Sequence, residues 1–227
     1  PDVLLGFASF PIAFCALIIG RTSIILDDTE HNHLNQWFYK NIASIILTPI
    51  SFGKIISQNQ VFFDSYMELA YLHLEYFKPF NYQTMADFFV SRRILFDATH
   101  DYNVDMSSLR WKMDYLCNKF TVVYSEEKVD EGITTKFHPA LLHQKLATAK
   151  LYIGEGATMA SESACLGIPT LYSNKLKVGY LAELAEEYSI VFDLDEYDDY
   201  EALDSLFESI IAKSNSDNQS IRERICN

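Results

Sequence analysis

Apolar and polar residues alternate regularly along the second half of the chain. Short apolar runs are typical of buried strands, and apolar residues at helical spacing lie between them. The predicted strands cover residues 93–96, 120–124, 151–153, 169–172 and 190–192, and the predicted helices cover 107–119, 139–149, 157–166, 180–188 and 200–212. Strands that alternate with helices indicate a parallel, doubly wound α/β sheet.

The first half shows the same alternation. Apolar runs cover residues 3–7, 23–26, 42–47 and 61–63, and predicted helices cover 11–19 and 34–41. We therefore predict two Rossmann-like domains, over residues 1–80 and 81–227, joined by a linker near 76–83. The polar end after Lys213 is expected to be frayed.

The uncharged stretch at residues 3–20 is long enough to be compared with a membrane span. Gly6, Ser9 and Pro11 interrupt it, and a second apolar run follows at 23–26. This pattern favours strand, turn, helix and strand, so we predict no transmembrane segment. No basic residues precede the stretch, which argues against a signal peptide.

Charge and cysteine content indicate which partners and which cellular location to expect. The 227 residues carry a net charge of −13, and no basic tract occurs, so nucleic acid is not an expected partner. The four cysteines form no C-x-x-C pair, which argues against a zinc finger or disulfide framework and predicts a cytoplasmic protein. We also predict that the protein can form a homodimer.

The stretch at residues 151–172 carries the strongest chemical signal. Glycines at 154 and 156 break the apolar run, and Gly167 and Pro169 end the helix that follows. A glycine loop before a helix offers free N–H groups and a positive dipole end, which bind anions such as phosphate. Glu162, further along the helix, could accept hydrogen bonds from sugar hydroxyls. The alternative is a strand-turn-helix unit with glycines for geometry and Glu162 on a solvated face.

Residues 154–169, Gly-Glu-Gly-Ala-Thr-Met-Ala-Ser-Glu-Ser-Ala-Cys-Leu-Gly-Ile-Pro, resemble the nucleotide-sugar loop of GT-B proteins. They are similar to the loop of non-hydrolysing UDP-N-acetylglucosamine 2-epimerases and, more closely, to the family called domain of unknown function 354. The resemblance implies a GT-B-like fold and a ribose-binding role for Glu162. It also implies a nucleotide site made by Gly154, Glu155, Gly156, Ala157, Thr158 and His138. Ala157 and Thr158 replace glycines of the epimerase pattern.

The resemblance covers nearly the whole chain, and the first strand and loop of GT-B proteins are not recognised in it. This predicts an N-terminal domain that is truncated. The segment from Tyr66 to His73 also resembles a junction segment of the same family, although an aromatic clasp between domains is the interpretation we favour.

Acids and histidines follow the predicted strand at 23–26. Asp27, Asp28, Glu30, His31 and His33 could bind a divalent metal, supply a general base, or cap the next helix. The Asp-Thr-Glu-His sequence is similar to a motif of the resembled family, which favours a functional role. We select Asp28, Glu30 and His31 as catalytic candidates and predict no metal.

His100 and Asp101 follow the predicted strand at 93–96, so they could form an oriented acid–base pair, or lie in an ordinary loop. The sequence lacks the Gly-x-Ser-x-Gly nucleophile motif and the Walker A motif.

The function expected from these features is binding of a UDP-sugar, with glycosyl transfer in polysaccharide biosynthesis. One alternative is 2-epimerisation of a UDP-N-acetylhexosamine. The other is a nucleotide-sugar-binding protein without catalysis. No further cofactor is expected.

Overall fold

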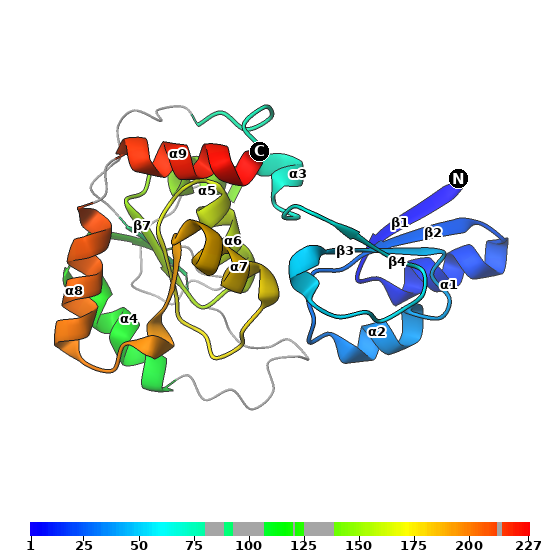
Figure 1. The fold of residues 1–227 in the computed structure, drawn as a ribbon, viewed down its shortest axis with the longest axis horizontal. Coiled ribbons are helices and arrows are strands. Elements are labelled where there is room, and N and C mark those ends of the chain that lie inside the picture. Colours follow the sequence, from blue (N-terminus) through cyan, green and yellow to red (C-terminus); the bar gives the residue numbers. More distant parts are fainter. Residues whose placement is uncertain (80–88, 93–106, 120, 125–138, 213–214) are drawn as a thin grey trace. The chain divides into compact units, whose positions relative to one another are not determined.

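The computed structural model describes residues 1–79, 89–92, 107–119, 121–124, 139–212 and 215–227 (Figure 1). The chain divides into two compact units. One comprises Pro1–Met67 with Val178–Tyr180, and the other comprises Glu68–Lys177 with Leu181–Asn227. Each unit contains its own parallel sheet.

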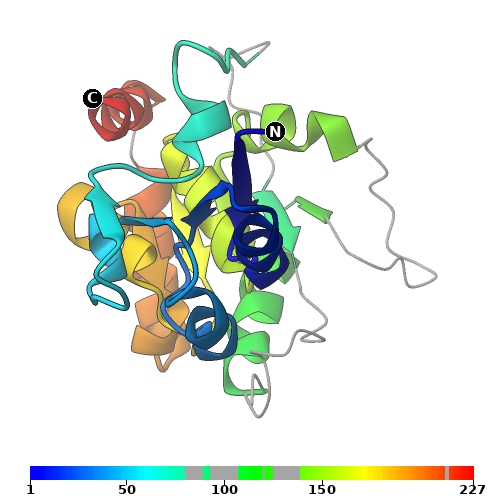
Figure 2. The ribbon, with the colours of Figure 1, turned by 90° about the vertical axis from the view of Figure 1, so that its right-hand side faces the viewer.

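Among the described residues, the first unit has a four-stranded parallel sheet in the order β1-β2-β3-β4. Its elements are β1 Val3–Phe7, α1 Phe10–Ile19, β2 Thr22–Leu26, α2 His33–Tyr39, β3 Ile45–Pro49, a 3-10 turn at Ile50–Phe52 and β4 Gln60–Phe63. Helices α1 and α2 lie on one face of this sheet (Figure 2), where Ala13, Ile25, Tyr39, Ala43 and Ile46 form a buried core. All predicted elements of this half are present.

Helix α1 forms as its sequence predicts. The side chain of Ser9 accepts a hydrogen bond from Ile12 N at 3.4 Å, and Pro11 lies in the first turn. Gly20 ends the helix with φ 65°, a conformation that glycine adopts without a Cβ penalty. No helix in the described part of the chain is both long and apolar enough to span a bilayer.

Among its described residues, the second unit has a five-stranded parallel sheet in the order β6-β5-β7-β8-β9. The elements after Met67 are α3 Leu69–Leu72, β5 Phe89–Arg92, α4 Ser107–Lys119, β6 Val122–Tyr124, a 3-10 turn at Pro139–Leu141, α5 Leu142–Leu146, β7 Leu151–Gly154, α6 Ala157–Cys165, β8 Thr170–Tyr172, α7 Gly179–Tyr188, β9 Val191–Asp193, a 3-10 turn at Leu194–Glu196, α8 Tyr200–Ile211 and α9 Asn215–Cys226. The first two residues of α7 belong to the first unit.

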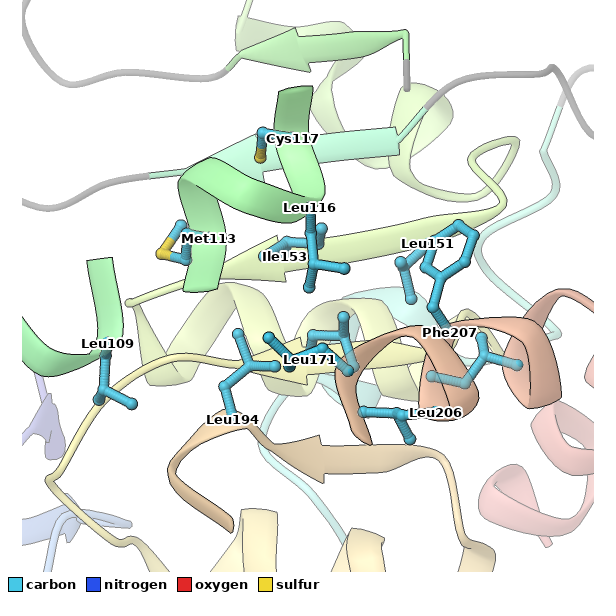
Figure 3. Close-up of a cluster of buried hydrophobic side chains, with 12 residues drawn as sticks. Leu109, Met113, Leu116, Cys117, Leu151, Ile153, Leu171, Leu194, Leu206 and Phe207 are labelled. Atoms are coloured by element: carbon cyan, nitrogen blue, oxygen red, sulfur yellow. The ribbon is translucent and has the colours of Figure 1, made fainter. Parts of the chain in front are cut away.

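A large apolar cluster fills the space between this sheet and the helices α4 and α8 (Figure 3). The apolar residues of α4 at helical spacing enter this cluster, as the sequence pattern predicts. The buried members are Leu109, Met113, Leu116, Cys117, Leu151, Ile153, Leu171, Leu194, Leu203, Leu206, Phe207 and Ile210. Strands β7 and β8 are buried along their whole length, which fixes the position of the loop between β7 and α6.

Two expectations for this half differ from the structure. The predicted strand at 93–96 is not one of them, because it lies outside the described residues, next to β5 at Phe89–Arg92. Helix α5 ends at Leu146, because the chain turns before β7 and Ala149 N donates to Leu146 O at 3.0 Å. The expectation of a frayed end was wrong, since α9 is a twelve-residue helix.

Buried polar contacts hold α9 in place. Arg222 is 2% exposed, and its Nη2 donates to the carbonyl oxygens of Leu72 at 3.1 Å and Phe77 at 2.9 Å. The guanidinium also lies 5.8 Å from the centre of the Phe77 ring. The segment around Leu72 therefore belongs to the second unit, although the predicted domain boundary lies at residue 80.

Candidate functional site

The loop between β7 and α6 forms the core of the candidate site. Gly156 is the N-cap of α6 with extended backbone angles, and it offers no side chain that could satisfy the first N–H groups of the helix. Ala160 N donates to Gly156 O at 3.1 Å, which begins the helical hydrogen-bond pattern. The N–H groups of Ala157 and Thr158 therefore have no acceptor within α6. Thr158 is exposed, so this helix end is accessible.

The first two residues of the loop have internal roles. A Cβ atom at Gly154 would lie 2.0 Å from the hydroxyl of the buried Tyr152, so packing alone requires glycine there. Glu155 is buried, and its Oε1 accepts from Arg110 Nε at 3.3 Å. Asn174 Nδ2 donates to the Glu155 carbonyl at 2.9 Å. The Glu155 carboxylate is thus paired with α4, and Arg110 offsets its negative charge beside the helix end.

Glu162 lies one turn beyond Thr158 on the same face of α6, because residues four apart lie above one another. Its side chain is 10% exposed. The Oε1 atom accepts a hydrogen bond from Tyr71 Oη at 2.9 Å and lies 3.1 Å from His143 Nε2. A buried carboxylate is therefore held by side chains from α3 and α5.

The sequence pointed to His143, in the helix before β7, as a candidate site residue, but it did not reveal that Tyr71 and His143 meet at Glu162. Tyr71 lies 91 positions from Glu162 in the chain, and its segment was interpreted as an aromatic clasp. The two rings pack with centroids 5.5 Å apart. Burial, with the adjacent Glu162 carboxylate as a further cause, raises the pKa of the Tyr71 phenol, which keeps it a hydrogen-bond donor.

The acids after β2 differ in how their carboxylates are held. Asp27 is buried and accepts hydrogen bonds from Tyr39 Oη, from Gln36 Nε2 at 3.3 Å and from Thr29 N at 3.0 Å. These contacts join β2 to α2. Burial raises the pKa of the Asp27 carboxyl, and the hydrogen bonds oppose that shift.

Asp28 is an acid of this cluster whose pKa is raised into the range where it can exchange a proton near neutral pH. Its Oδ1 accepts from Thr29 Oγ1 at 3.0 Å. Burial raises its pKa to about 6, and the neighbouring charges of Asp27 and Glu30 act in the same direction. A carboxyl with this pKa can gain or release a proton near neutral pH.

The other candidates of this cluster lie close to Asp28 in the chain. The backbone carbonyl of Glu30 accepts hydrogen bonds from Lys54 Nζ and from Gln36 Nε2, the latter at 3.4 Å. His31 is exposed.

His100, Asp101 and His138 lie outside the described residues. Within the described ranges, no three or more His, Cys, Asp or Glu side chains gather in a way that could hold a metal ion.

The fold has known counterparts among solved structures. The chain matches a Staphylococcus aureus MnaA structure with UDP at a TM-score of 0.59 and 12% identity, covering 100% of this chain and 68% of that one. It matches the spinosyn rhamnosyltransferase SpnG with thymidine diphosphate at a TM-score of 0.59 and 12% identity, covering 99% of this chain and 69% of that one.

A third match is a protein described as a UDP-N-acetylglucosamine 2-epimerase from Listeria monocytogenes. Its TM-score is 0.58 at 10% identity, with 100% of this chain and 68% of that one covered. The fold is GT-B-like. No protein-family model and no curated protein sequence matches the chain, so membership in the family called domain of unknown function 354 stays a prediction.

Proposed function

We propose that the second unit binds the nucleoside diphosphate part of a nucleotide sugar. The diphosphate would accept hydrogen bonds from the N–H groups of Ala157 and Thr158, where the helix dipole favours negative charge. The ribose would contact Glu162. The observation that carries this proposal is the accessible end of α6 with a fixed carboxylate on the same helix face. Two of the structural counterparts were solved with UDP or thymidine diphosphate, which supports it.

Glycosyl transfer in polysaccharide biosynthesis is the activity we propose for this site. Stabilisation of the departing diphosphate by the end of α6 is the chemistry that such a transfer requires. The first unit would supply acceptor or proton-transfer groups from Asp28, Glu30 and His31. The Asp28 carboxyl, with a pKa of about 6, suits a general base. We also propose a cytoplasmic location, because all four cysteines are free thiols.

The likeness to an epimerase favours 2-epimerisation as the second candidate. Solvent deuterium at C2 of the recovered sugar would identify epimerisation. Release of UDP that depends on an added acceptor would identify transfer, and binding without turnover would identify a sensor.

The nucleotide site is tested by titrating UDP and UDP-N-acetylglucosamine into the protein by calorimetry. Glu162→Gln keeps the side-chain size and removes the charge, so it should weaken UDP binding about tenfold, the value of one hydrogen bond to a charged group. The matched control is Glu208→Gln, which changes an exposed acid on α8 and should bind as the wild type does. Equal affinity of Glu162→Gln and wild type would remove Glu162 from the site.

A further inference from the structure

Helices α1 and α2 of the first unit present a row of four aromatic rings. The ring of Phe10 in α1 lies 5.6 Å from that of Phe14 and 4.8 Å from that of Phe38 in α2, measured between centroids. Trp37 continues the row, with its ring centroid 4.9 Å from that of Phe38. The two helices lie side by side on the sheet (Figure 2). The four rings therefore form one continuous surface.

The aromatic row belongs to a larger apolar surface, which we call the α1–α2 patch. On α1, Leu17 and Ile18 lie one turn beyond Phe14, and on α2, Leu34 lies one turn before Trp37. Six side chains of the patch are between 39% and 68% exposed: Phe14, Leu17, Ile18, Leu34, Trp37 and Phe38. Together they present about 700 Å² of apolar area, since a fully exposed side chain of this size presents about 200 Å². Monomeric proteins rarely expose a contiguous apolar patch of this size, so the patch indicates an interaction site.

The helices that form the α1–α2 patch carry no formal charge. Neither α1 nor α2 contains Asp, Glu, Lys or Arg, whereas the whole chain has a net charge of −13. Two copies of so acidic a chain repel each other, and contact over an uncharged surface adds least to that repulsion. An uncharged apolar surface is also complementary to itself, as the interface of a two-fold dimer must be. Both properties favour a second copy of this chain as the partner.

A lipid surface matches the α1–α2 patch less well. Helices that lie in a membrane interface are rich in Lys and Arg on their polar face, and anionic lipids attract them. Here the basic residues Arg21 and Lys40 only follow the two helices, and Arg21 Nη1 lies 3.5 Å from Asp2 Oδ1. The net charge of −13 also opposes approach to an anionic bilayer.

We infer that the α1–α2 patch is the interface of a homodimer, in which α1 and α2 of one copy pack against the same helices of the other. Interfaces of standard size bury about 800 Å² on each partner, close to the area that the patch presents. Aromatic side chains are enriched and charged ones depleted at the core of such interfaces, as they are here. This interface lies in the first unit and does not depend on the proposed nucleotide site.

Sedimentation equilibrium of the full chain tests this interface. Interfaces of this size have dissociation constants in the micromolar range or below, so at about 100 µM the 26.1 kDa chain should sediment with twice its mass. Trp37→Glu places a charge on both sides of the interface and should raise the dissociation constant of the dimer at least about thirtyfold, the effect of losing one hot-spot residue. Ile18→Glu should act in the same direction from α1. Circular dichroism would establish that each variant is folded.

Leu5→Glu is the matched control, because it introduces the same charge on the other face of the first sheet. A Cβ atom at Gly6 would lie 3.0 Å from the Ile12 side chain of α1, so Gly6 faces the helices and the exposed Leu5 beside it faces away. The dimer of this variant should be as stable as that of the wild type.

A wild-type chain that stays monomeric at about 100 µM would overturn the inference. If that monomer floats with phosphatidylcholine vesicles, the patch is a lipid-binding surface instead. A dimer that both Trp37→Glu and Ile18→Glu leave intact, or that Leu5→Glu weakens as much as they do, would place the interface elsewhere and overturn the inference as well.

Discussion

Gly167→Ala is expected to destabilise the second unit by about 2–5 kcal/mol. Gly167 has φ +79°, where an alanine costs about 1–2 kcal/mol. A Cβ atom there would also lie 2.4 Å from the backbone oxygen of Asn218 in α9, and overpacking of this kind costs about 1–3 kcal/mol more. Trp111, which packs against the core of this unit, reports its unfolding by fluorescence when Trp37 is replaced by Phe.

Gly20→Ala is the matched comparison for this prediction. Gly20 ends α1 with φ +65°, and a Cβ atom there would meet no heavy atom within 4 Å. Its cost should therefore be the backbone strain alone, about 1–2 kcal/mol. The free energy of unfolding is measured for each variant on its own unit. If both variants lose the same amount, the close approach of a Cβ atom at position 167 to α9 adds nothing to the cost of Gly167→Ala.

Asp28→Asn is expected to stabilise the first unit at pH 8 by about 2 kcal/mol and to change its stability little at pH 3.5. The folded pKa of about 6 lies above the unfolded value of about 3.9, so the folded state binds the proton more tightly. The contribution of Asp28 to the free energy of unfolding is therefore most favourable below pH 4 and is lost as the pH rises through 6. The full shift corresponds to about 3 kcal/mol, which partial exposure reduces.

Denaturant unfolding followed by Trp37 fluorescence, in a Trp111→Phe background, measures this effect on the first unit. Asp64→Asn removes an exposed carboxylate of the same unit and is the control for the loss of one charge. A stability difference between wild type and Asp28→Asn that stays constant from pH 4 to pH 8 would contradict the raised pKa.

The sequence predicted the elements whose signals are local. Apolar spacing located α4 at both ends, and Gly167 with Pro169 marked the end of α6, where Gly167 does adopt a positive φ. The strand β7 and the glycine loop were likewise visible, because a buried strand followed by glycines has a clear pattern. These are the elements that build the candidate nucleotide site.

The features that the sequence did not reveal depend on contacts distant in the chain. Helix α9 looked like a polar tail, because its anchor is a buried arginine whose acceptors lie 150 and 145 positions earlier. Asp27 looked like part of a reactive cluster, and its hydrogen bonds to Tyr39 and Gln36 assign it to the core. No local pattern shows that Tyr71 reaches Glu162.

Amide chemical shifts of isotope-labelled protein, recorded with increasing UDP, test whether the end of α6 binds the diphosphate. The amides of Gly156, Ala157 and Thr158 should shift most at saturation, because the diphosphate would accept hydrogen bonds from the end of α6. Uridine, which lacks the diphosphate, should leave these amides unchanged. If UDP saturates the protein and the chemical shifts of these three amides do not change, the diphosphate does not bind at the end of α6 and the nucleotide site lies elsewhere.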